Sequence, residues 1–292
     1  FIKKNNILLF NEDFTDYSQF DKLDDNYDDF YMLASMIGVN NTLNNPHEII
    51  RVNTALIYNS LEWIKKSNIK NVLFTSTSEC YSATIDKFKY KIPTPEDIPL
   101  CIDPIDHPRF TYAVTKMLGE SGFLNYSKIF GFNCKIIRYN NIFGPKMGFG
   151  HVIPHLVERF IDCEEPFKIF GSNQTRSFCY IDDGALGTIQ AMECDNAKHD
   201  IFHIGSEDEI TIKDLVIETG KFFNYKGKYE VGPTYPGSVS RRCPDISKSK
   251  KMFNFFPKVN WKDGLKLTLE WYKNYYDNNT KRYYEDPYKF IK

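Results

Sequence analysis

Hydrophobic and polar positions follow two alternating rhythms along this chain. Short runs of apolar, β-branched or aromatic residues predict strands, and longer amphipathic stretches predict helices. The predicted strands cover residues 6–10, 30–34, 71–76 and 134–139, and the predicted helices cover residues 46–67 and 109–130. Pro46 at the start of the first helix and Gly131 after the second suit a helix start and a C-cap. The alternation is typical of an α/β fold built on a parallel sheet.

The rhythm becomes irregular after Pro145, where the apolar runs are shorter and turn residues more frequent. We therefore expect residues 1–150 to form a nucleotide-binding lobe and residues 151–292 to form mainly a smaller substrate lobe. The apolar run at 201–205 is expected to return to the first lobe as a strand. Residues 276–292 are rich in tyrosine, asparagine and charge, and we expect them to be loosely ordered.

The front of the chain lacks a feature that a doubly wound dinucleotide-binding sheet normally has. Such a sheet begins with a strand, a glycine-rich turn and a helix whose N-terminus holds the pyrophosphate. No such glycine pattern occurs in the first forty residues. Two explanations stand at this point: the chain is truncated, or the cofactor is held by a smaller site without this turn.

Composition narrows the class of protein. The 37 lysines and arginines nearly balance the 38 aspartates and glutamates, so charge gives no reason to expect nucleic acid or an anionic membrane as a partner. No apolar run approaches the roughly 20 residues that cross a bilayer. Seven dispersed cysteines without a Cys-x-x-Cys pair favour reduced thiols. These features predict a cytoplasmic globular protein.

A tyrosine and a lysine four residues apart carry the first chemical signal. Tyr112 and Lys116 fall on one face of the helix predicted over 109–130. A phenol is a weak base at its usual pKa of roughly 10, and a nearby ammonium favours the phenolate. The pair suits removal of a hydroxyl proton while a hydride leaves the same carbon. The polar residues at 76–79, directly after a predicted strand, would supply a hydroxyl and a carboxylate for the step that follows.

Seven segments between residues 6 and 272 carry a family resemblance when they are taken in order. They are Asp-Phe at 13–14, Leu-Ala-Ser at 33–35, Ser-Thr-Ser-Glu at 76–79, Tyr-x-x-x-Lys at 112–116, Arg-x-x-Asn-Ile-Phe-Gly-Pro at 138–145, an arginine-bearing strand at 174–183, and Arg-x-Pro-Asp at 242–245. This order resembles the extended short-chain dehydrogenases/reductases of the nucleotide-sugar epimerase/dehydratase group. The resemblance implies a Rossmann-like, doubly wound parallel sheet with a smaller mixed α/β substrate lobe. It also implies a nucleotide-sugar substrate and NAD as cofactor, with NADP as the alternative.

The resemblance assigns a role to each matching residue. The implied catalytic residues are Thr77, Ser78, Glu79, Tyr112 and Lys116. The implied cofactor contacts are Asp13, Phe14, Leu33, Ala34 and Ser35, together with Tyr112 and Lys116. The implied substrate contacts are Asn141, Arg176 and Arg242. The helices at 46–67 and 109–130 resemble those at the family's two-fold interface, so a homodimer is expected by analogy.

The reaction is predicted less sharply than the family. In the family's shared chemistry, C4 of the sugar is oxidised, and the resulting ketone makes neighbouring positions labile. A 4-epimerase has no use for a carboxylate at the position of Glu79, whereas a 4,6-dehydratase needs a base for the C5 proton. Related decarboxylases place a Ser-Glu pair and an arginine from the C-terminal part of the chain around the sugar carboxylate, which matches Ser78, Glu79 and Arg242. Decarboxylation of a UDP-hexuronate is therefore the first choice, with dehydration and epimerisation as alternatives.

Other readings of the chain stay open. A binding protein that retains the sugar-nucleotide site without catalysis would account for the absent glycine turn, whereas a simple alcohol dehydrogenase would leave the substrate lobe unexplained. His151 and His155 are spaced as a metal pair would be on a helix, but no third ligand is spaced to join them, so no metal is predicted. Asp182 and Asp183 are expected to cap a helix that begins at Gly184.

Overall fold

The computed structural model describes residues 7–234 and 238–281, apart from the side chains of residues 39 and 40. Its main sheet has four parallel strands in the order β1-β2-β3-β8. These strands are β1 (Asp29–Met32), β2 (Asn71–Thr77), β3 (Asn133–Tyr139) and β8 (Asp200–Ile204). The prediction of an α/β fold with a parallel sheet is confirmed.

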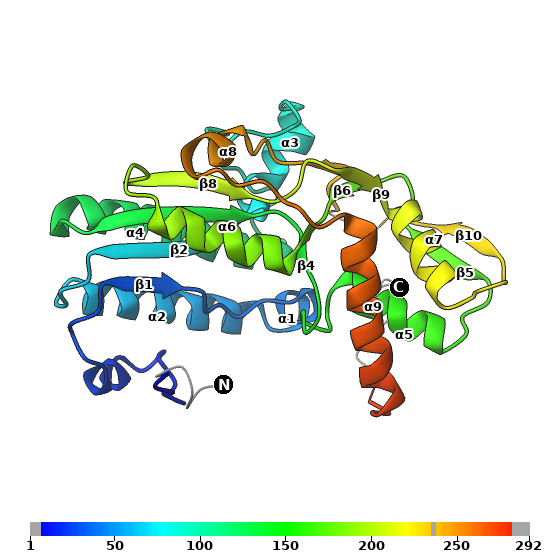
Figure 1. Cartoon of the computed structure of the whole chain (residues 1–292), viewed down its shortest axis with the longest axis horizontal. Coiled ribbons are helices and arrows are strands. Elements are labelled where there is room, and N and C mark those ends of the chain that lie inside the picture. Colours follow the sequence, from blue (N-terminus) through cyan, green and yellow to red (C-terminus); the bar gives the residue numbers. More distant parts are fainter. Residues whose placement is uncertain (1–6, 235–237, 282–292) are drawn as a thin grey trace.

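Helices cover both faces of this sheet, and for that reason the central strands are apolar on both sides. Along β2, Val72 and Phe74 pack against α2 (Pro46–Ile64) and α4 (Thr111–Phe130), whereas Leu73 points to the opposite face. That opposite face is covered by α6 (Ile181–Glu193) and α8 (Ser247–Phe253). Figure 1 shows α2 and α6 on either side of the strands. Successive side chains of a strand alternate between the faces, so each face has its own core.

A second group of elements lies beyond the carboxyl end of β1 (Figure 1). Its core joins three helices to a two-stranded parallel sheet. These elements are α5 (Val152–Ile161), α7 (Ile212–Phe222), α9 (Trp261–Asp277), β5 (Phe167–Phe170) and β10 (Tyr229–Gly232). The boundary near residue 150 between two functional lobes stays a prediction.

Short strands link the two groups. One three-stranded sheet has the order β11-β6-β9, and β4 pairs with β7. The strands are β4 (Ile142–Phe143), β6 (Thr175–Ser177), β7 (Cys179–Tyr180), β9 (Glu209–Thr211) and β11 (Arg241–Arg242). The remaining described helices are α1 (Val39–Asn44), α3 (Ser82–Phe88) and the 3-10 turns η2 (Tyr17–Lys22), η3 (Ser78–Tyr81) and η4 (Pro108–Phe110).

Two local predictions are wrong, and a third is wrong at its first residues. Residues 7–10 form no strand, because no neighbouring strand pairs with them and their side chains are exposed. The helix α6 begins at Ile181, so Asp183 does not cap it; its carboxylate instead accepts the backbone N–H groups of Lys258 and Val259 ahead of α9. The C-terminal helix α9 runs to Asp277 and so takes in the start of the segment expected to be loose. Residue 6 and residues 282–292 lie outside the described part.

The helix α4 lies very close to the sheet, and this closeness sets the position of Tyr112. A Cβ atom added at Gly119 would be 2.2 Å from the Phe74 ring, so only glycine permits the approach. The helix ends as predicted at Gly131, whose φ of 83° is in the left-handed region that glycine adopts freely.

Candidate active site

The predicted catalytic residues gather at the carboxyl edge of the main sheet. Thr77 ends β2 and pairs in register with Tyr139, which ends β3. Ligands of open parallel sheets bind at this edge, where several strands end together. The chain then turns into η3 and brings Ser78 and Glu79 beside the first turns of α4.

Tyr112 and Lys116 occupy the first turns of α4, facing β2. The Lys116 ammonium is buried, donates a hydrogen bond to the Thr75 carbonyl at 2.7 Å, and lies 5.7 Å from the centre of the Tyr112 ring. Burial lowers the pKa of Lys116 to about 8. Burial also raises the pKa of Tyr112 above its usual value, with further contributions from Cys80 and Glu79. Desolvation is the largest of these causes, and the expectation that Lys116 lowers the Tyr112 pKa stays a prediction.

Glu79 is held as an anion by two arginines. Its Oε1 atom accepts a hydrogen bond from Arg242 Nη1 at 2.8 Å and lies 3.6 Å from Arg109 Nη2. Burial alone would raise the pKa of Glu79, but the charges of Arg242 and Arg109 bring it down to about 2. A carboxylate with this pKa stays ionised at neutral pH and is a weak base.

Arg242 has hydrogen-bonding capacity that the chain does not use. Its side chain is only 7% exposed, and its Nε and Nη2 atoms are buried without a hydrogen-bond partner among the described residues. These two atoms form one edge of the guanidinium, the edge that binds a carboxylate or phosphate through two parallel hydrogen bonds. Leaving such buried donors unpaired is costly, so this edge is a candidate to bind an anionic ligand.

A third arginine adds to this positive charge. Arg176 on β6 stands directly opposite Arg242 on β11. Burial and the charge of Arg242 lower the pKa of Arg176 to about 9, and its guanidinium donates to the Thr175 carbonyl at 2.7 Å. Like charges placed opposite each other on adjacent strands repel. Glu79 forms ion pairs with Arg242 and Arg109, and Asp86 adds a second negative charge that acts on Arg176 and Arg242, so the three arginines outnumber these carboxylates.

The predicted cofactor residues outside α4 lie before η2 and directly after β1. Asn59 of α2 donates hydrogen bonds to the carbonyl oxygens of Phe14 and Thr15, which fixes the turn next to Asp13. Leu33, Ala34 and Ser35 follow the end of β1 at the same edge as Thr77. The Ser35 hydroxyl is buried and unpaired among the described residues. An unpaired hydroxyl and a buried ammonium at this edge fit a cofactor that carries ribose hydroxyl groups.

Asn141 follows β3 with a φ of 44°, a left-handed conformation that asparagine adopts more readily than most residues. Its Nδ2 atom donates to the Ser177 carbonyl at 3.0 Å, so its Oδ1 atom is the group left to meet a substrate.

His151 precedes α5 and His155 lies within it, and burial lowers the pKa of both. Within residues 7–234 and 238–281, no cluster of side chains is arranged to hold a metal ion.

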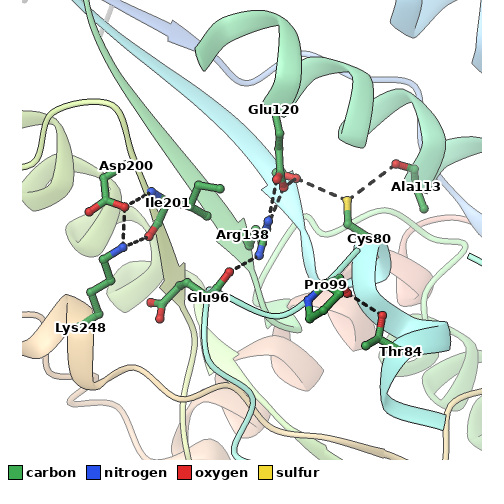
Figure 2. A network of polar contacts seen from close by, with 11 residues as sticks. Cys80, Thr84, Glu96, Pro99, Ala113, Glu120, Arg138, Asp200, Ile201 and Lys248 are labelled. Carbon is green, nitrogen blue, oxygen red and sulfur yellow. Dashed lines mark hydrogen bonds and ion pairs between the residues drawn. The ribbon is translucent and has the colours of Figure 1, made fainter. Parts of the chain in front are cut away.

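Three residues of this region were not on the list predicted from the sequence. Arg109 precedes Tyr112 by three residues and contacts Glu79. Glu120 and Arg138 form a buried ion pair beneath the site, shown in Figure 2. Glu120 lies four residues after Lys116, and this helical spacing was the available signal.

The parallel sheet and the polar residues gathered at its carboxyl edge fit an enzyme that binds a dinucleotide cofactor. The chain belongs to the NAD dependent epimerase/dehydratase family, whose model matches residues 3–205. This membership confirms the predicted family and makes NAD the cofactor. None of the described helices has the length and apolarity that a membrane span requires.

Relatives and solved structures agree with this membership. The chain is 31% identical to UDP-N-acetyl-alpha-D-glucosaminuronate decarboxylase of Bacillus cytotoxicus, over 88% of this chain and 80% of the relative. It is 30% identical to UDP-glucuronate 4-epimerase of Thermodesulfobacterium geofontis, over 82% and 71%. UDP-glucuronic acid 4-epimerase of Bacillus cereus, solved with NAD and UDP-4-deoxy-4-fluoro-glucuronic acid, superimposes with a TM-score of 0.81 at 25% identity, covering 93% and 83%. These similarities support NAD-dependent modification of a nucleotide sugar.

Proposed function

We propose that this enzyme decarboxylates a UDP-hexuronate through a 4-keto intermediate. The observation that carries the proposal is the buried, unpaired Nε–Nη2 edge of Arg242, held beside the ionised Glu79. A planar carboxylate on the sugar matches this edge, and the glucose of UDP-glucose carries no carboxylate, although its diphosphate is anionic as in every UDP-sugar. The similarity to the Bacillus cytotoxicus decarboxylase supports the same substrate class.

Each step can be written for the residues of this chain. NAD, when bound, accepts the hydride that leaves C4 of the sugar. Tyr112 takes the C4 hydroxyl proton, Lys116 balances the phenolate charge, and Thr77 orients the C4 oxygen. The product is a β-keto acid, in which the bond between C5 and the carboxyl carbon breaks while its electrons move toward the C4 carbonyl. C5 then takes up a proton, and the ketone is reduced again when the hydride returns to C4 and Tyr112 gives its proton back to the C4 oxygen. Arg242 and Ser78 hold the carboxyl group in position until carbon dioxide leaves.

Dehydration is the less favoured alternative. A 4,6-dehydratase must remove the C5 proton, and Glu79 is the residue that would do it. With its pKa at about 2, Glu79 has little affinity for a proton near neutral pH. Decarboxylation makes no such demand, because it removes no proton from C5.

Epimerisation is the second candidate. It is favoured by the 30% identity to a UDP-glucuronate 4-epimerase, whose substrate also carries a carboxylate. An epimerase of this kind would use Arg242 to hold the sugar while the 4-keto group turns over. The arginine cluster therefore supports a UDP-hexuronate in both cases, and only the product distinguishes the two.

One assay separates the candidates. The full-length protein, supplied with NAD, is incubated with UDP-glucuronate, UDP-N-acetylglucosaminuronate or UDP-glucose, and the products are analysed by mass spectrometry and NMR. Loss of the mass of carbon dioxide from a hexuronate supports the proposal. A product of unchanged mass with inverted C4 indicates the epimerase, and loss of the mass of water indicates the dehydratase. No turnover, combined with tight binding of UDP-hexuronate, would favour a non-catalytic binding protein.

We also propose that two copies associate through α2 and α4. Their outer surface exposes Ile50, Tyr58 and Leu118, and a shallow apolar hollow between the helices is lined by residues such as Ile57 and Gly122. Contiguous exposed apolar surface of this kind is typical of an interface.

All seven cysteines are free thiols, which supports work in the reducing cytoplasm.

A further inference from the structure

A buried ion pair lies directly beneath the proposed proton-transfer site. Glu120 projects from α4 one turn after Lys116, and its carboxylate accepts hydrogen bonds from Arg138 Nε at 2.8 Å and Nη2 at 2.7 Å. The side chains are only 4% and 3% exposed. Figure 2 shows this bidentate pair between α4 and β3. Burying two charges costs solvation free energy, so a buried pair is weak evidence for a role in stability alone.

On one side, the pair fixes the end of β2 to α4. The Ser76 hydroxyl donates a hydrogen bond to Glu120 Oε1, and Ser76 immediately precedes Thr77. Cys80 adds weaker contacts to the Ser76 hydroxyl and to the Ala113 carbonyl. The segment that carries Thr77 and Glu79 is thereby tied to the helix that carries Tyr112 and Lys116.

On the other side, the pair reaches the strand segment that carries Arg242. Arg138 Nη1 donates to the Glu96 backbone carbonyl at 2.9 Å. Two residues earlier, Thr94 forms an isolated parallel bridge with Pro244, in which its N–H donates to the Cys243 carbonyl at 2.9 Å. Arg138 therefore holds the segment that lies against the residues directly after Arg242.

We propose that Glu120 and Arg138 are a positioning pair that sets the geometry between the Tyr112–Lys116 proton-transfer group and the anion site at Arg242. Neither residue touches the substrate; each acts through the elements it joins. Arg138 is suited to this because one guanidinium can bind a carboxylate on one edge and a carbonyl with its remaining nitrogen. The inference goes beyond the proposed decarboxylation, since any reaction that begins with hydride loss at C4 needs the same geometry.

The test removes the charges without leaving one of them buried alone. The double variant Glu120→Leu/Arg138→Met in the full-length protein replaces the pair by apolar groups of similar size. Replacing a buried ion pair in this way often leaves the free energy of unfolding unchanged or raises it. Its matched control is Glu164→Leu/Arg159→Met, which removes another bidentate pair, between the end of α5 and β5. Thermal unfolding is measured for each protein. Steady-state kinetics are measured with the UDP-sugar that the wild-type enzyme converts, whatever the product of that reaction.

The proposal predicts that the double variant unfolds near the wild-type temperature while its kcat falls about 100-fold, the cost of a misplacement near 1 Å. The control should keep the wild-type kcat and KM. A folded double variant with wild-type kcat and KM would overturn the proposal. If the double variant does not fold, Arg138→Lys decides: it keeps the charge but cannot form the bidentate contact with Glu120, so wild-type kcat in this variant would also refute the positioning role.

Discussion

The ionised state of Glu79 leads to a prediction about stability as a function of pH. Its pKa of about 2 in the folded protein compares with an ordinary glutamate pKa of 4.5, and this difference corresponds to roughly 3 kcal/mol at neutral pH. Because the folded pKa is the lower one, this stabilisation is fully present above about pH 4.5 and declines as the pH falls toward 2. The Glu79→Gln variant lacks it at every pH. It also leaves Arg242 buried beside a neutral amide.

The assay is urea unfolding of wild type and Glu79→Gln at a series of pH values from 7 down to about 3. The variant should be less stable by about 3 kcal/mol at pH 7, and the difference should shrink to about half near pH 3. Glu48→Gln is the control, since Glu48 forms an equally short ion pair with Arg51 on the exposed surface of α2, where such pairs contribute little. A Glu79→Gln difference that is independent of pH, or no larger than that of Glu48→Gln, would refute the reasoning.

Three further predictions concern the site and the surface. Tyr112→Phe should lower kcat about 10²–10⁴-fold, because it removes the proton acceptor, while UDP-sugar affinity measured by calorimetry stays near wild type. Arg242→Met should weaken UDP-glucuronate binding about 10–100-fold through the loss of two charged hydrogen bonds, whereas Arg241→Met, on the exposed side of β11, should not. Tyr58→Glu combined with Leu118→Glu should shift the protein toward monomer in light scattering, because it puts charge on the apolar surface of α2 and α4.

Each of these has a result that would contradict it. Retained turnover in Tyr112→Phe would mean that another group accepts the C4 proton. The sugar carboxylate would not be the partner of Arg242 if Arg242→Met and Arg241→Met lost the same affinity for UDP-glucuronate. The same would follow if Arg242→Met lost as much affinity for UDP as for UDP-glucuronate. If light scattering gives the same molar mass for the Tyr58→Glu/Leu118→Glu variant as for the wild type, any interface between copies does not involve this surface.

Much of the fold could be predicted because the central strands carry a local signal. β2 and β3 are buried on both faces, so their apolar runs mark them directly, and Gly131 marks the end of α4. The run at 7–10 has the same composition but no partner strand, and composition alone cannot reveal that. The role of Asp183 was missed for a similar reason, since its partners lie some 75 residues away along the chain.

The candidate site was predicted in part. Tyr112, Lys116 and Glu79 belong to recognisable short segments, and the structure brings all of them to one edge of the sheet. Their electrostatics could not be predicted, because the pKa values depend on burial and, for Glu79, on arginines elsewhere in the sequence. The pairing of Glu120 with Arg138 likewise needs the packing of a helix on a strand, which spacing along the helix only suggests.

The ion pair between Glu79 and Arg242 joins residues that are 163 positions apart in the chain. Closing a loop of this length costs conformational entropy, which is repaid only when the chain between the two residues is folded. The Glu79 carboxylate and the Arg242 guanidinium are therefore brought together by the fold as a whole, whereas Tyr112 and Lys116 are neighbours within one helix.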